Sequence, residues 1–274
     1  DTEIQRGGMR ITSTFDRDAQ KAASAAVRRM GPQSGTDGLR IGLAAVRPGT
    51  GEIVAVYGGN DYVTDQINNA TTPFAQAGST FKPFALAAAV EQEVPLNSIW
   101  EGDSPATIDG YTLTNYGDRS YGPVSLLKAT ENSINTAYVQ MESDIGVKSV
   151  ADAAVRAGIP AKTPGMDLKD LNLTFVLGSA SPSGLDMANA YATFAAEGKR
   201  AQTHVIKEIV GANDGLLYQL DPAVESAFSA DVANTVTFAL NKVITDGTGS
   251  TALALGRPAA GKTGTTDDNK SAWF

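Results

Sequence analysis

The stretch GSTFKPF, residues 78–84, decides how the rest of the chain is interpreted. Pro83 has no N–H and is tolerated only in the first turn of a helix, so the sequence predicts a helix that begins near Thr80. The apolar run that follows is strongly helix-forming. Ser79 is therefore expected at or just before the first turn of the helix, with Lys82 three residues further on the same face.

This placement has chemical consequences for Lys82. The positive helix end and the flanking Phe81 and Phe84 are expected to lower the pKa of its ammonium group. A neutral lysine beside the Ser79 hydroxyl is a base beside a nucleophile, and the free N–H at the helix start can stabilise an oxyanion. The same S-x-x-K pattern also fits an N-cap serine followed by a solvated lysine. Other motifs must therefore decide between a catalytic serine and a helix cap.

The composition is that of an ordinary globular protein with one or two domains. The chain has 274 residues, of which 42% are hydrophobic and 19% charged, and its net charge is −8 without a basic stripe. Nucleic acid is therefore not an expected partner. With no cysteine and one histidine, we expect no disulfide, no metal and no cofactor. No apolar run reaches about 18 residues, so the fragment itself is expected to be soluble.

The hydrophobic periodicity predicts an α/β (α+β) fold with strands towards both ends of the chain. Helices are predicted over residues 17–30, 80–90, 124–132, 136–145, 147–157, 184–196 and 230–243. Strands are predicted over residues 9–15, 39–46, 52–57, 204–210, 216–220, 259–266 and 271–274. This order indicates an antiparallel sheet closed by distant segments. A mostly helical region, 79–250, would be inserted between the sheet strands 39–57 and 259–274.

Two further motifs fit a site built on Ser79. The first, Ser133-Ile134-Asn135, offers a hydroxyl for proton relay and an amide that can hold a carbonyl, although a polar turn between helices explains it equally simply. The second, Lys262-Thr263-Gly264-Thr265, offers a cation and two hydroxyls on a strand. Gly264 leaves room for a substrate backbone along that strand, so that a carboxylate would meet the lysine and both threonines.

Two competing motifs point to other chemistry. Residues 256–263 match the phosphate-loop pattern G-x-x-x-x-G-K-T, but a strand and an acidic turn follow where that loop requires a helix. We therefore expect no nucleotide binding there. The single histidine, His204, lies in an alternating strand-like stretch, and the chain has no G-x-S-x-G elbow for a Ser-His-Asp triad.

In the order S-x-x-K, S-x-N and K-T-G, the three motifs resemble the signature of penicillin-recognising serine acyltransferases. The resemblance to a penicillin-binding transpeptidase domain covers nearly all of the chain and includes residues 7–16, 69–71, 177–179, 190–195 and 246–249. The tail, residues 261–268 and 272–274, looks most like the class A, bifunctional branch.

The resemblance implies a β-lactamase/transpeptidase-like fold over one domain, residues 1–274. Its core would be a five-stranded antiparallel sheet flanked by helices, with an all-helical subdomain. The last strand and the C-terminal helix of that fold would be missing from this chain. Strands 39–46 and 271–274 would then lie at a gap with unpaired backbone groups, each costing about 1–3 kcal/mol when buried. We therefore expect a second chain to carry the missing strand and helix.

The resemblance also assigns catalytic roles to the motif residues. Ser79 would be the acylated nucleophile, and Lys82 would take its proton. Ser133 would relay a proton to the leaving group near Lys262, while Asn135 would hold the substrate amide.

For the substrate, the resemblance implies a terminal D-Ala-D-Ala of a peptidoglycan stem peptide. Thr263 and Thr265 would bind its carboxylate beside Gly264, and the backbone N–H groups of Ser79 and Thr265 would form the oxyanion hole. An amine of a neighbouring stem peptide would accept the acyl group, and β-lactams would stall at the acyl stage. The parent protein would be membrane-anchored with an N-terminal glycosyltransferase domain, on the extracytoplasmic face of the bacterial membrane.

Three rival interpretations stay open. A class A β-lactamase carries E-x-x-L-N downstream of the second motif; here Leu171-Asn172 is present, but Leu168 stands at the glutamate position. A D,D-carboxypeptidase would use water as the acceptor, and the motifs do not separate it from a transpeptidase. A non-enzymatic penicillin sensor or scaffold would not need the intact Ser79, Lys82 and Lys262.

Overall fold

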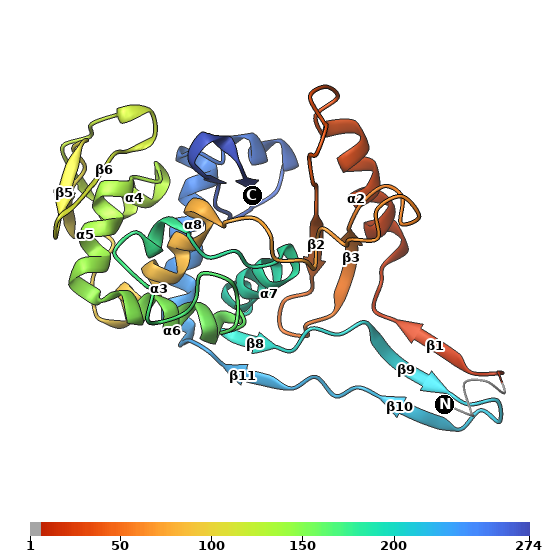
Figure 1. Cartoon of the computed structure of the whole chain (residues 1–274). Coiled ribbons are helices and arrows are strands. Elements are labelled where there is room, and N and C mark those ends of the chain that lie inside the picture. Colours follow the sequence, from red (N-terminus) through yellow and green to blue (C-terminus); the bar gives the residue numbers. More distant parts are fainter. Residues whose placement is uncertain (1–6) are drawn as a thin grey trace. The chain divides into compact units, whose positions relative to one another are not determined.

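The computed structural model describes residues 7–274, which belong to two compact units (Figure 1). The first unit consists of Asp1–Thr72 and Ser183–Ser226, and the second of Pro73–Pro182 and Ala227–Phe274. No helix in the described part of the chain is both long enough and apolar enough to cross a membrane.

The first unit contains two α-helices and three small antiparallel sheets. The helices are α2 (Arg17–Met30) and α7 (Gly184–Ala195). The sheets are β2–β3 (Leu43–Val46, Ile53–Tyr57), β1–β9–β10 (Arg10–Ser13, Ile206–Val210, Leu216–Gln219) and β8–β11 (Lys199–Ala201, Val224–Ser226). Helix α2 packs on β3 and α7 on β2, so the β2–β3 hairpin lies between two helices (Figure 1).

Local sequence chemistry sets the ends of α2. The Asp16 carboxylate accepts hydrogen bonds from the N–H groups of Asp18 and Ala19, at 2.9 and 2.8 Å. These bonds satisfy donors that the first helical turn leaves open and hold the pKa of the Asp16 carboxyl below its ordinary value. The helix ends at Gly31, ahead of Pro32. The prediction for residues 17–30 is thus confirmed at both ends.

The second unit is mostly helical. Its α-helices are α3 (Lys82–Glu91), α4 (Leu126–Glu131), α5 (Asn135–Ile145), α6 (Val147–Ala157) and α8 (Ala230–Asp246). Its 3₁₀ turns are η1 (Gly78–Phe81), η2 (Tyr116–Asp118), η3 (Phe175–Leu177), η4 (Ser250–Leu255) and η5 (Asp267–Asn269). Its strands form the pairs β4–β7 (Ile99–Glu101, Pro123–Ser125), β5–β6 (Ala106–Ile108, Tyr111–Leu113) and β12–β13 (Gly264–Thr265, Ala272–Trp273).

Helix α3 is the buried centre of the second unit. Residues Lys82–Ala89 are all buried, and α3 packs against α5, α6 and α8. Its run of small alanine side chains allows these neighbours to approach from several sides. Figure 1 shows α6 and α8 beside it. Because α3 begins with Lys82, this packing fixes the position of the lysine at the helix start.

The start of α3 differs from the prediction of a helix from Thr80. Residues Gly78–Phe81 form the tighter 3₁₀ turn η1, and α3 begins at Lys82 with Pro83 as its second residue. Proline fits there because the N–H groups of the first helical turn have no partner within the helix. Ser79 therefore lies in the turn before the helix, not in the helix itself.

The predicted five-stranded sheet is not present as one ladder among residues 7–274. Strands β2 and β3 form one two-stranded sheet, and β12 and β13 form another. Strands β12 and β13 have two residues each, far shorter than the predicted 259–266 and 271–274. No fifth strand is paired with either hairpin in the described part of the chain. A second chain that completes the sheet stays a prediction.

Gly178 determines how closely the segment before Ser79 can pack. It has a φ of 82° at the end of η3, and a Cβ there would lie 2.0 Å from the carbonyl oxygen of Gly78. The Gly78 N–H donates to the Gly178 carbonyl at 3.1 Å, and the Ala77 N–H donates to Ala180 at 2.9 Å. Only glycine at position 178 allows this contact.

Gly178→Ala is expected to displace the turn that carries Ser79. The left-handed φ alone costs about 1–2 kcal/mol, and the contact with Gly78 adds about 1–3 kcal/mol. Gly117→Ala is the matched control, because Gly117 has a φ of 65° but no atom within 4 Å of the added Cβ. Chemical denaturation should show the larger loss only for Gly178→Ala. Equal losses in the two variants would contradict the packing argument.

Candidate active site

The residues of the S-x-x-K motif lie where η1 joins α3. Ser79 is half-buried, and the Thr80 hydroxyl donates to the Ala77 carbonyl at 2.6 Å, which closes the turn. Lys82 is 0% exposed, so its ammonium group depends on protein acceptors. The Ser79 hydroxyl has no hydrogen bond to a described residue, so no hydrogen bond joins it to Lys82.

Lys82 instead points to the S-x-N motif. Its Nζ donates to the Ser133 carbonyl at 2.7 Å and to Asn135 Oδ1 at 2.8 Å, and it lies 3.2 Å from the Ser133 hydroxyl. The motif lies in the turn between α4 and α5, which brings residues about fifty positions apart into direct contact. The sequence did not predict that Lys82 bonds these acceptors, because Ser133 and Asn135 become its neighbours only when the helices pack together.

Ser133 lies between two lysines. Lys262 Nζ donates to the Ser133 hydroxyl at 2.8 Å and to the Thr263 carbonyl at 3.0 Å. Ser133 itself has a φ of 57°, which is uncommon for a residue other than glycine. This backbone conformation aims one hydroxyl at both Lys82 and Lys262, so a hydrogen-bonded path connects the two amines.

Burial lowers the pKa of both lysines. The pKa of Lys82 is held well below its ordinary value, first by burial and then by the positive charge of Lys262. Burial lowers the pKa of Lys262 to about 7. No carboxylate in the described part of the chain forms an ion pair with either amine. A neutral Lys82 can still donate its two N–H groups to Ser133 and Asn135, which leaves its lone pair to accept a proton.

The amide of Asn135 is held at both ends. Its Oδ1 accepts from Lys82, and its Nδ2 donates to the Thr114 carbonyl at 3.0 Å. Next to Thr114, the buried Asn115 donates to the carbonyls of Gly102 and Arg119 and accepts from the Thr136 N–H at 3.0 Å. Thr114 and Asn115 were not predicted as part of the site. Thr114 acts through its backbone carbonyl, and Asn115 belongs to none of the three motifs.

Strand β12 lies against the turn that carries Ser79. A Cβ on Gly264 would lie 2.8 Å from the Ala77 carbonyl oxygen and 3.0 Å from the Thr80 nitrogen. The side-chain face of Gly264 is therefore filled by the η1 turn, which explains why glycine is needed there. That a substrate backbone lies along the edge of this strand stays a prediction. A Cβ on Gly78 would similarly meet the Thr265 backbone at 3.1 Å, so Thr265 lies next to the residue before Ser79.

The competing motifs gain no support from the structure. Thr263 is followed by strand β12 and not by the helix that a phosphate loop needs. The Nδ1 atom of His204 lies 3.2 Å from the carbonyl oxygen of Gln202, two residues earlier. Leu168, at the position of the β-lactamase glutamate, is exposed. Among residues 7–274, no group of three or more His, Asp or Glu side chains could hold a metal ion.

Glu142 on α5 is a buried carboxyl that belongs to none of the three motifs. Its Oε2 accepts from the Val176 N–H at 3.1 Å, whereas Oε1 has no hydrogen-bond partner within the described residues. Burial raises the pKa of Glu142 to about 8, although the bond from Val176 acts in the opposite direction. The carboxyl is thus protonated at neutral pH. Its hydrogen bond from Val176 ties α5 to η3, the turn that ends at Gly178.

Glu142→Gln is expected to remove one pH-dependent component of stability. The folded-state pKa of about 8 lies above the ordinary value of 4.5, so the folded protein keeps a proton that the unfolded chain loses. Wild-type stability should therefore fall as pH rises from about 4.5 to about 8 relative to the glutamine variant. Denaturation series at several pH values measure this difference. A constant difference across that range would contradict a buried, protonated Glu142.

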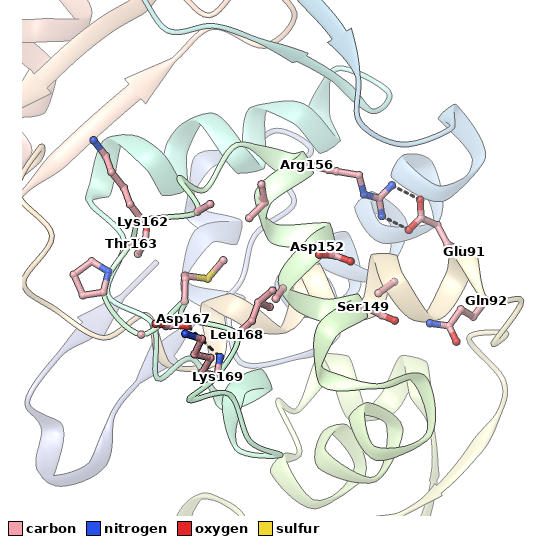
Figure 2. A pocket seen from close by; sticks show the side chains of 17 residues that line it. Glu91, Gln92, Ser149, Asp152, Arg156, Lys162, Thr163, Asp167, Leu168 and Lys169 are labelled. Atoms are coloured by element: carbon pink, nitrogen blue, oxygen red, sulfur yellow. Dashed lines mark hydrogen bonds and ion pairs between the residues drawn. The ribbon is translucent and has the colours of Figure 1, made fainter.

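A separate cavity of about 1160 Å³ lies beside α3, at the end away from Lys82 (Figure 2). Its walls come from the end of α3, from α6 and from residues 161–169. Figure 2 shows the ion pair between Arg156 and Glu91, with 2.7 Å between Nη1 and Oε1. None of the predicted site residues lines this cavity, so it lies outside the candidate active site.

The geometry is that of a serine acyltransferase, and comparison with known proteins specifies the family. The model of the penicillin binding protein transpeptidase domain matches residues 41–272. Penicillin-binding protein 1A of Mycobacterium tuberculosis is 36% identical over 290 residues, which cover 97% of this chain and 34% of that protein. This chain thus spans about a third of the length of the curated relative. It belongs to the penicillin-binding protein transpeptidase family, and the class A resemblance is confirmed.

Solved structures agree with this assignment. The penicillin-binding protein PonA1 of Mycobacterium tuberculosis has a TM-score of 0.85 at 31% identity, over 99% of this chain and 72% of that one. PonA1 in complex with penicillin V has the same TM-score, over 98% of this chain and 73% of that one. The transpeptidase fold predicted from the motifs is therefore confirmed, although its sheet is not complete among the described residues.

Proposed function

We propose that this chain is the acylating domain of a peptidoglycan D,D-transpeptidase, with Ser79 as its nucleophile. The proposal depends on one hydrogen-bonded cluster, formed by Lys82, Ser133, Asn135 and Lys262. Its Lys82 directly follows the turn that holds Ser79. The cluster supplies a buried amine with a lowered pKa, a proton path and a fixed amide.

In the first half-reaction, the Ser79 oxygen attacks the carbonyl carbon of the penultimate D-Ala. Lys82 takes the hydroxyl proton, which requires its neutral form. The C–N bond breaks as Ser133 passes a proton to the leaving D-Ala nitrogen, and the path between the lysines restores the Ser133 proton. The product is an ester between the donor peptide and Ser79.

In the second half-reaction, an amine of a neighbouring stem peptide attacks that ester. The C–O bond to Ser79 breaks, the serine regains a proton, and the new amide is the cross-link. During both steps, the N–H groups of Ser79 and Thr265 would stabilise the oxyanion, and the close packing of Gly78 on Thr265 supports this pairing.

β-Lactams would occupy the same site, and the complex of the similar PonA1 with penicillin V supports β-lactam binding. A β-lactam carries an acyl carbonyl and a carboxylate in positions that resemble D-Ala-D-Ala. The parent protein would be membrane-anchored, with a glycosyltransferase domain before this one, and would work on the extracytoplasmic side of the membrane.

The proposal is tested by supplying a D-Ala-D-Ala stem-peptide donor with and without an amine acceptor. Release of D-Ala with formation of an amide-linked product is the expected result. Release of D-Ala with only hydrolysed donor, whatever the acceptor concentration, would favour the carboxypeptidase. No release of D-Ala and no acylation by the donor would contradict the proposed enzyme and favour a non-enzymatic sensor or scaffold.

A further inference from the structure

Thr248 is a polar residue next to the K-T-G motif that the proposed mechanism does not use. It belongs to the stretch Asp246-Gly247-Thr248-Gly249 after α8, which the sequence resemblance included without a role. Its hydroxyl lies 2.6 Å from the hydroxyl of Thr263, which is a short hydrogen bond between two side chains at the surface of the site.

The backbone of Thr248 is held in place by the turn between α4 and the S-x-N motif. Its N–H donates to the Glu131 carbonyl at 3.1 Å. A Cβ on the preceding Gly247 would lie 2.2 Å from that same carbonyl oxygen, so glycine is required for the contact. Glu131 is only two residues before Ser133. The same short turn therefore positions Ser133 and, through Thr248, the hydroxyl of Thr263.

A threonine hydroxyl has one hydrogen to donate, and it rotates freely unless a partner fixes it. If Thr248 donates to the Thr263 oxygen, the hydrogen of Thr263 is left to point at a bound acceptor. A chain of two hydroxyls also strengthens the outer hydrogen bond. Beneath the pair, the buried Lys262 donates to the Thr263 carbonyl, so the local charge favours an anion as that acceptor.

The neighbouring acidic groups do not compete for this position. The Glu131 carboxylate is paired with Lys128 at 2.7 Å. The Asp246 carboxylate accepts from Lys242 at 3.1 Å and from the Thr245 hydroxyl at 2.7 Å. Both acids therefore have cationic partners, and the Thr248–Thr263 pair is free to act on the substrate.

We propose that Thr248 is a positioning residue that fixes the Thr263 hydroxyl towards the carboxylate of the donor substrate or of a β-lactam. This inference rests on the proposed function, because it assumes that the carboxylate binds at Thr263. It adds a specificity determinant: Thr248 favours substrates with a free terminal carboxylate over those in which that group is neutral.

The test compares penicillin G with its carboxyl methyl ester on the wild-type chain and on Thr248→Val, which keeps the side-chain shape. The second-order rate constant for acylation by penicillin G is expected to fall about 10- to 100-fold, the size of one hydrogen bond to a charged group. Acylation by the ester is expected to be unchanged. Thr248→Ser should restore most of the rate.

A double-mutant cycle shows whether Thr248 acts through Thr263. In a Thr263→Val background, Thr248→Val is expected to cause no further loss with penicillin G. Thr251→Val is the control, because Thr251 is an exposed threonine of the same segment whose hydroxyl has no hydrogen bond to a described residue. It should leave both rates unchanged.

The outcomes separate the two proposals. If mass spectrometry finds no wild-type acylation at Ser79, the proposed function fails, and the inference fails with it. If the wild type is acylated at Ser79 but Thr248→Val keeps the penicillin G rate, the inference alone is overturned. An equal loss with penicillin G and its ester, or an equal loss in the Thr263→Val background, would also overturn it.

Discussion

Ser79→Ala is expected to abolish the covalent adduct with a penicillin completely. The adduct is an ester to the Ser79 oxygen, and alanine has no atom that can form it. The fold should be unaffected, because Ser79 is half-buried and its hydroxyl forms no hydrogen bond with a described residue. The change in unfolding free energy should stay within about 0.5 kcal/mol. Intact-protein mass spectrometry after incubation with a penicillin measures the adduct, and thermal denaturation is the control for folding.

The structure provides a specific rival for the nucleophile in this experiment. The Ser133 hydroxyl is hydrogen-bonded to Lys262 and lies 3.2 Å from Lys82, whereas the Ser79 hydroxyl has no hydrogen bond to a described residue. An adduct that persists in Ser79→Ala and maps to Ser133 would contradict the assigned roles. Ser133→Ala is the matched variant: it should slow acylation but leave the adduct on Ser79.

Removal of the Lys82 amine is expected to have the second-largest effect. Loss of a general base typically lowers a rate by about 10²–10⁴-fold, and acylation of Lys82→Ala should fall by this amount. The substitution also removes core volume, because Lys82 is among the largest fully buried side chains. Alanine would leave a cavity and two acceptors, on Ser133 and Asn135, without their donor.

Lys82→Met separates the chemical effect from the structural one. Methionine keeps most of the buried stem but has no basic nitrogen, so the packing loss of about 2–5 kcal/mol for a large-to-alanine change is avoided. Stopped-flow acylation of the two variants should be slowed similarly. Both lose the donor to Ser133 and Asn135, but Lys82→Ala should lose more stability because only it also leaves a cavity. Acylation of Lys82→Met at the wild-type rate would show that Lys82 is not the base.

The helices were predictable wherever local chemistry marks their ends. Residues 17–30 have the Asp16 cap and the terminal Gly31, and α6 matches its prediction at both ends because Gly158 follows it. The short pairs β4–β7 and β5–β6 were missed, because their strands have three residues each and carry many exposed side chains. Such segments have no clear alternation, and tertiary contacts decide their conformation.

The site was predictable as a set of residues but not as a set of contacts. The three motifs, far apart in the sequence, do meet: Lys82 and Lys262 both lie within hydrogen-bond distance of the Ser133 hydroxyl. The hydrogen bonds of Lys82 to Ser133 and Asn135 were not predicted, and its action on the Ser79 hydroxyl stays a prediction. The contacts of Thr114 and Gly178 are made by backbone atoms, which every residue has, so sequence motifs give no signal for them.

The lifetime and location of the adduct formed by the unaltered chain with a penicillin test the central claim most directly. Mass spectrometry of the intact protein over hours, followed by peptide mapping, should find one penicilloyl group on Ser79 that persists through that time. This result is expected because Leu168 stands where a β-lactamase has its deacylating glutamate. An adduct that turns over within seconds would favour the β-lactamase, and an adduct on another residue would contradict Ser79 as the nucleophile.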